Sequence, residues 1–205
     1  MIKYLIQGFM LGLAYVAPIG MQNLYVINTA ATQKKVNAYR VAFITIFFDI
    51  SLALSCFFGM GALMEKFTIL KMIVMLIGAF LVIYIGIQLI RSNPDINSNI
   101  TIEKSVLKVV VSCFSITWLN PQAIIDGSLL LGGFRESLPH AAAILFIGGV
   151  CLASFSWFTI VTTVVSALRQ KFNRNIIKII NVVCGVVIIY YGLKLAYSFV
   201  KLQFV

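Results

Sequence analysis

The chain has 205 residues, of which 61% are hydrophobic and 11% are charged, and its formal net charge is +10. This composition, with a mean hydropathy of +1.02, excludes an ordinary soluble domain. It predicts an all-α integral membrane protein, because a helix satisfies its own backbone hydrogen bonds inside a bilayer.

Six apolar runs are long enough to cross a bilayer as helices. They lie at residues 4–27, 41–64, 72–90, 105–131, 141–168 and 176–200. Because these runs take up nearly the whole sequence, we expect residues 1–205 to form a single transmembrane domain.

The first and fourth runs are both interrupted. Pro18 and Gly20 interrupt the first, Pro121 interrupts the fourth, and a polar residue, Asn23 or Asp126, follows each proline by five positions. Proline breaks the helical hydrogen-bond ladder and frees backbone groups, which is tolerable at membrane depth only beside a cavity. Paired broken helices in the two halves of a chain indicate the substrate site of a secondary transporter.

The two halves also resemble each other. The segment beginning at Tyr84, Y-I-G-I-Q-L, resembles Y-Y-G-L-K-L beginning at Tyr190, an offset of 106 (190 − 84), and the two prolines are 103 apart (121 − 18). Three spans per half require the halves to enter the membrane from opposite sides. We therefore expect six transmembrane helices arranged as two inverted three-helix repeats, residues 1–92 and 105–205, with helices 1 and 4 broken.

One carboxylate lies in the middle of an apolar run. Asp49 stands between aromatic and aliphatic neighbours, where an unpaired charge costs at least about 2.5–3.5 kcal/mol. We expect it to face the bundle interior and to hold a partner, a proton or a cationic ligand, with a structural hydrogen-bonded pair as the alternative. Asp126 is the second candidate, since the break at Pro121 places it near a water-filled mouth.

Amide side chains flank both breaks. Gln22, Asn23 and Asn120 can either hold a substrate or satisfy the broken backbone, and both uses need the same geometry. Trp118 and Trp157 are typical of the aromatic belt at membrane interfaces. The four cysteines stand singly in separate apolar runs, so we expect no cysteine metal site, and we expect no cofactor.

The basic residues are distributed unequally between alternate connections. Ten belong to the connections on one side: Lys34, Lys35, Arg40, Arg91, Lys104, Lys108, Arg169, Lys171, Arg174 and Lys178. Five belong to the other side: Lys3, Lys66, Lys71, Arg135 and Lys201. The positive-inside rule makes the first set cytoplasmic and both termini external. The expected partner of this basic face is the lipid headgroup layer, not nucleic acid.

Five segments together resemble the lysine and arginine exporter (LysE) family. They are P-I-G-M-Q-N from Pro18, F-D-I around Asp49, T-W-L-N-P from Thr117 with Asp126 after it, A-S-F-S-W-F from Ala153 and I-N-V-V from Ile180. Met21 stands where the family's first motif, P-x-G-P-x-N, has its second proline.

The resemblance implies a secondary transporter that exports basic amino acids, arginine or lysine, across the bacterial inner membrane, driven by an ion gradient, with the proton as the expected coupling ion. Combined with the residues, it gives a hypothetical site. The substrate carboxylate lies against backbone N–H groups near Gly20 and Pro121, assisted by Gln22, Asn23 and Asn120. Asp49 and Asp126 attract its cationic group.

Other readings of the sequence remain. A neutral amino acid or a divalent metal cation is an alternative cargo, although a metal exporter favours more carboxylate, histidine or cysteine ligands. An enzyme is disfavoured because no serine or cysteine has an evident base partner. The sequence leaves the oligomeric state open.

The asymmetry of basic residues predicts an orientation. Tags at both termini should be accessible from the periplasmic side of intact cells, while a tag beside Arg174 should be accessible only after the inner membrane is opened. A cytoplasmic N-terminus together with a periplasmic C-terminus would mean that one predicted span does not cross.

Overall fold

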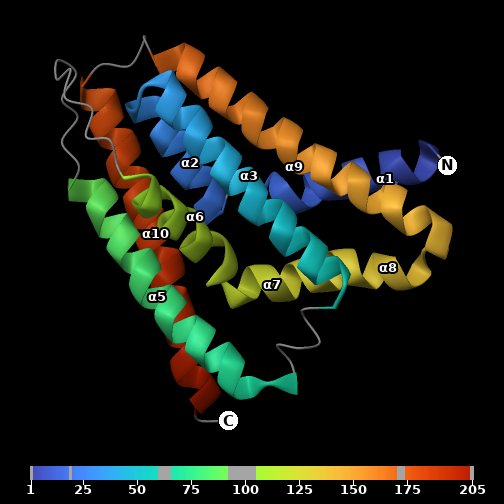
Figure 1. The fold of residues 1–205 in the computed structure, drawn as a ribbon. Helices are drawn as coiled ribbons and strands as arrows, with labels where there is room; N and C mark the ends of the chain where they lie inside the picture. The colour runs from blue at the N-terminus through green and yellow to red at the C-terminus, as the bar shows by residue number, and fades with distance from the viewer. Residues whose placement is uncertain (1, 19, 60–65, 92–104, 170–173, 204–205) are drawn as a thin grey trace.

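A computed structural model describes residues 2–18, 20–59, 66–91, 105–169 and 174–203. Regular structure in these ranges is helical throughout (Figure 1). The elements are, in chain order, α1 (Ile2–Val16), α2 (Met21–Thr32), α3 (Lys35–Phe57), α5 (Thr68–Arg91), α6 (Val106–Trp118), α7 (Pro121–Gly127), the π-helix η1 (Ser128–Gly132), α8 (Gly133–Ser137), α9 (His140–Leu168) and α10 (Arg174–Gln203).

Two described helices, Lys35–Phe57 and Ala142–Leu168, are long and apolar enough to cross a membrane. Two bent pairs add a candidate span each: Ile2–Val16 with Met21–Thr32, and Val106–Trp118 with Ala123–Arg135. The apolar stretches of α5 and α10, Leu76–Arg91 and Asn175–Tyr190, are shorter. The described residues thus hold two to four candidate spans, and the count of six remains a prediction.

Both predicted helix breaks are confirmed. The first pair is bent by 79° and the second by 64°. Gly20 precedes α2 in an extended conformation (φ −115°, ψ −169°). Asn120 precedes α7 with φ −113° and ψ 90°, the extended backbone that a following proline enforces, and Pro121 begins the helix.

Some helix boundaries differ from the predicted spans. The α3 helix begins at Lys35, six residues before the predicted start, because a helix can continue past its apolar part into the polar surface layer. After the second break the chain runs through α7, the π-turn η1 and α8 to Ser137, beyond the predicted end at residue 131. The predicted residues 60–64 of the second span lie outside the described residues.

The two halves pack reciprocally. The α5 and α10 helices lie along each other, and α3 lies against α9 (Figure 1). The broken element of each half contacts the long helix of the other half. In the first half, α1 contacts α9; in the second half, α6, α7 and η1 contact α3. These contacts join the two halves, and the inverted three-helix repeat remains a prediction.

The buried core lies where these elements meet. Its largest cluster joins α2, α3, α5, α6, α9 and α10 around side chains such as Val26, Ile46, Val82 and Phe158. Large apolar side chains also cover outward surfaces, for example Phe47, Phe80 and Ile144, which are 67%, 78% and 78% exposed. An apolar exterior of this kind suits contact with lipid.

Glycines allow α1 and α9 to approach closely. A Cβ atom at Gly8 would collide with the carbonyl group of Phe146, and one at Gly149 would collide with the carbonyl oxygen of Leu5. Close backbone contact of this type drives helix association in membranes, where apolar burial gives no preference for protein over lipid.

Gly148 and Gly149 offer a matched pair for testing this contact. Gly149→Ala should destabilise the protein by about 1–3 kcal/mol through overpacking. Gly148→Ala should be neutral or stabilising by up to about 1 kcal/mol, because a Cβ there meets nothing within 4 Å and alanine favours helix. Thermal unfolding in detergent measures both, and equal melting temperatures for the two variants would contradict the proposed contact.

Candidate functional site

Asp49 lies at the centre of the candidate site. It belongs to α3 and is 1% exposed. Ser154 of α9 donates a hydrogen bond of 2.6 Å to Oδ2, and the Gln22 amide of α2 donates one of 3.3 Å to Oδ1. Both carboxylate oxygens therefore have neutral donors, and no described lysine or arginine forms an ion pair with Asp49. The arrangement leaves the carboxyl group able to hold a proton or to attract a cation.

Gln22 links three helices around this carboxyl group. Besides Asp49, its amide nitrogen donates to the Thr117 hydroxyl of α6 at 2.9 Å. Thr117 is buried at the end of the helix that precedes the second break. The side chain following the first break is thus connected both to the intramembrane carboxylate and to the second broken helix.

Asn23 satisfies the backbone of the first break. Its amide nitrogen donates to the carbonyl oxygens of Val16 at 2.9 Å and of Pro18 at 2.8 Å, which lie where the ladder of α1 ends. The indole N–H of Trp157 donates to the Asn23 Oδ1 at 2.8 Å. Of the two uses expected for Asn23, this geometry provides the structural one, with all three amide contacts directed at protein groups.

At the second break the structure describes the backbone but only some of the side chains. The Asn120 carbonyl oxygen accepts the N–H of Ile124 at 3.3 Å, and the Asn120 side chain is half-buried. Asp126 lies in α7, but its side chain, like those of Pro121 and Gln122, is outside the described part of the structure. The predicted convergence of Asp126 on the site therefore remains a prediction.

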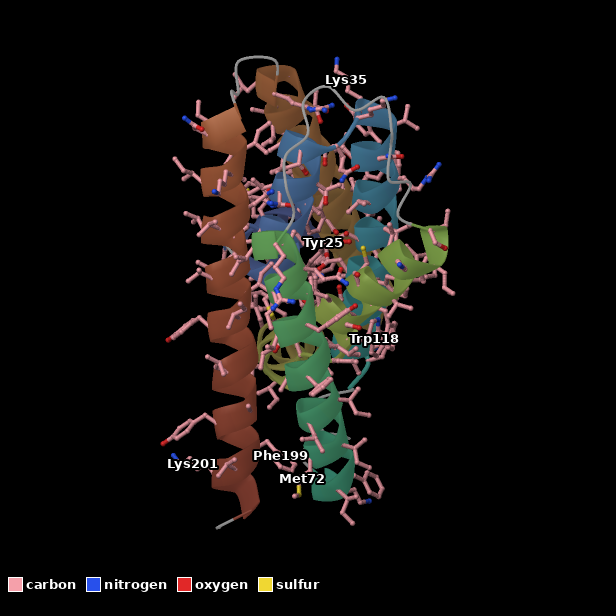
Figure 2. The ribbon with its side chains drawn as sticks, turned by 90° about the vertical axis from the view of Figure 1, so that its left-hand side faces the viewer. Tyr25, Lys35, Met72, Trp118, Phe199 and Lys201 are labelled. Carbon is pink, nitrogen blue, oxygen red and sulfur yellow. The ribbon has the colours of Figure 1, made fainter. Side chains whose placement is uncertain are left out.

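Near the second break, α3 forms polar contacts with both α6 and α7. Trp118, which Figure 2 labels, donates its indole N–H to the Ser51 hydroxyl at 3.0 Å, and Cys56 donates to the carbonyl oxygen of Ile124 at 3.4 Å. The π-helix η1 follows α7 directly. Such π-turns loosen the regular ladder and are frequent at functional sites.

Of the predicted site residues, Gln22 and Asp49 are in direct contact, and three partners of Gln22, Asn23 and Asp49 were not predicted. Ser154, Thr117 and Trp157 all lie in the motifs that carry the family resemblance, which was the available signal. Both indole N–H groups donate to side chains within the bundle, a role that the aromatic-belt interpretation of Trp118 and Trp157 did not include.

Comparison with known proteins identifies the family. The model of the LysE type translocator family matches residues 13–199, so the chain belongs to this family and is a multi-pass membrane transporter, not an enzyme. Among curated proteins it is similar to arginine exporter proteins ArgO of Salmonella enteritidis PT4, Salmonella newport and Salmonella typhimurium LT2. Each is 27% identical over 201 residues, covering 96% of this chain and 94% of the relative. No solved structure matches the chain.

Asn23 offers a test of the break-point contacts. Asn23→Ala removes the donor to two carbonyl oxygens and should destabilise the protein by about 1–3 kcal/mol. Trp157→Phe removes one donor and should cost less. Thermal unfolding in detergent measures both effects. Ser156→Ala is the control on α9, since among the described residues the Ser156 hydroxyl bonds only to carbonyl groups of its own helix. Unchanged stability of Asn23→Ala would show that the break does not need this amide.

Proposed function

We propose that the protein exports a basic amino acid, arginine or lysine, from the bacterial cytoplasm across the inner membrane, coupled to the proton gradient. The observation that carries the proposal is the buried Asp49, held by neutral donors beside a broken helix. Membership of a translocator family and similarity to arginine exporters point the same way. A buried carboxylate without a described protein cation suits a cationic substrate.

The proposed binding mode uses both ends of the amino acid. The cationic side chain or the ammonium group binds at Asp49, displacing one of its neutral donors. The α-carboxylate lies near Gly20, where the first N–H groups of α2 have no intrahelical partner and carry partial positive charge. Asn120 and Asp126, at the second break, complete the binding site in this proposal.

Transport then requires the Asp49 carboxyl group to alternate between two partners. Substrate binds the ionised form and leaves on the external side, and a proton neutralises the carboxylate during the return. Because Gln22 touches both Asp49 and Thr117, loss or gain of the carboxylate charge changes a contact that reaches the second broken helix. The reciprocal packing of the halves supports alternating access by related repeats.

A neutral amino acid or a divalent metal cation is the alternative cargo. Purified protein in liposomes distinguishes them, because only the true substrate supports counterflow. Labelled arginine or lysine should exchange, while a labelled neutral amino acid or a divalent metal should not. Metal flux without amino-acid exchange would replace the proposal, and counterflow of a neutral amino acid alone would keep the transporter but exclude the basic side chain, leaving the α-ammonium group as the only cationic partner for Asp49.

Asp49→Asn tests the central residue. It keeps the shape of the side chain but removes the charge, and losing one member of a buried charge pair costs about 2–5 kcal/mol. Since 1.4 kcal/mol is tenfold, export should fall at least about tenfold. Efflux of labelled arginine from preloaded cells, normalised to the amount of protein in the membrane, gives the measurement. Ser156→Ala should export normally, and wild-type efflux by Asp49→Asn would exclude Asp49 from the site.

A further inference from the structure

A polar pocket separate from the Asp49 site lies at the corner between α2 and α3. The residues around it are Tyr25, Asn28, Thr29, Thr32, Gln33, Asn37, Arg40, Val41 and Val109. The space open to the centres of water molecules is about 30 Å³, which suffices for about two waters. This is the size of the two oxygens of one carboxylate group.

Three polar side chains of the pocket lining have no partner among the described residues. Gln33, Asn37 and Arg40 are half-buried, and within the described ranges none of the three side chains is hydrogen-bonded or ion-paired. No carboxylate belongs to the described lining. A guanidinium group with no described partner attracts an anion and repels a cation, and it binds carboxylate through two parallel hydrogen bonds. The two neighbouring amides can add N–H donors.

The pocket and Asp49 lie along the same pair of helices. Arg40 precedes Asp49 by nine residues on α3, about 13 Å along the helix axis. Tyr25, one turn after Gln22 on α2, is 2% exposed and forms part of the pocket wall. In Figure 2, Tyr25 lies between Lys35, near one end of the bundle, and Trp118. Nine residues are also about two and a half turns, so Arg40 and Asp49 lie on opposite faces of α3.

We propose that this pocket is a second, carboxylate-binding site, in which Arg40 receives the carboxylate of an amino acid at the α2–α3 end of the bundle before the molecule reaches Asp49. The identity of the ligand rests on the proposed function, whereas the preference for an anion rests on the pocket alone. Arg40 selects molecules that carry a carboxylate, and Asp49 selects for positive charge.

A reactive cysteine in the pocket tests the charge preference directly. Asn37→Cys is placed in a full-length protein whose four native cysteines are replaced by alanine. An anionic sulfonatoethyl methanethiosulfonate should label position 37 about tenfold faster than the cationic trimethylammonioethyl reagent, because Arg40 lies beside it. Arg40→Gln should abolish this preference and Arg40→Lys should keep part of it. Lys35→Gln, which removes an equal charge from the same helix end outside the pocket lining, should leave it unchanged.

Protection from labelling identifies the ligand. L-Arginine and L-alanine should slow labelling at position 37, while agmatine, which has the guanidinium group of arginine but no carboxylate, should not. Arg40→Gln should remove the protection. Persistence of the charge preference or of the protection in Arg40→Gln, equal protection by agmatine, or protection by phosphatidylglycerol but not by amino acids would each overturn the proposal.

The outcome also separates this proposal from the proposed function. If labelled arginine and lysine show no counterflow in liposomes but L-alanine still protects position 37 in an Arg40-dependent manner, the carboxylate pocket stands and the basic substrate is wrong. If arginine exchanges normally but neither amino acid protects, the basic substrate stands and the pocket is not a carboxylate site.

Discussion

The structure depends on how the backbone freed at the Pro18–Gly20 break is satisfied. In a bilayer each unpaired carbonyl group costs several kcal/mol. The bend of 79° between α1 and α2 is therefore stable only if other groups donate hydrogen bonds to the carbonyl groups that the helix leaves free. The Asn23 amide does this for Val16 and Pro18, and Trp157 fixes the amide in turn. The direction of α2, and therefore the position of Gln22 beside Asp49, follows from these bonds.

The break explains why a carboxylate is tolerated in the middle of α3. A continuous first helix would offer Asp49 only apolar side chains and closed backbone. The displaced α2 brings the Gln22 amide to one carboxylate oxygen, and α9 brings the Ser154 hydroxyl to the other. Two neutral hydrogen bonds offset part of the cost of the charge without cancelling it. The site thus stays electrostatically available to a cation or a proton.

Local rules of sequence were enough to predict the breaks and the inward direction of Asp49, because proline chemistry and the cost of a buried charge act within a few residues. The partners of Asp49 were not predictable in this way. Ser154 is 105 positions away from it, and Thr117 is 95 positions from Gln22, so these contacts depend on helix packing across the whole bundle. Helix ends were misplaced for another reason: hydropathy marks the apolar part of a helix, whereas α3 begins in the polar sequence at Lys35.

The contacts of α2 constrain how two repeats could exchange conformations. Three of its side chains form hydrogen bonds with the second half of the chain: Gln22 with Thr117, Asn23 with Trp157, and Asn28 with Asn181 at 2.7 Å. Rigid rocking of one half against the other must therefore break these three hydrogen bonds, or α2 must move with the second half and bend at its own break.

The cost of breaking these bonds is small. Interhelical hydrogen bonds in membranes average about 0.6 kcal/mol each, so breaking all three costs about 2 kcal/mol. A substrate that binds one conformation about 30-fold more tightly supplies that amount, since tenfold corresponds to 1.4 kcal/mol. The polar contacts that hold α2 in place are thus weak enough for ligand binding to shift the equilibrium between two arrangements.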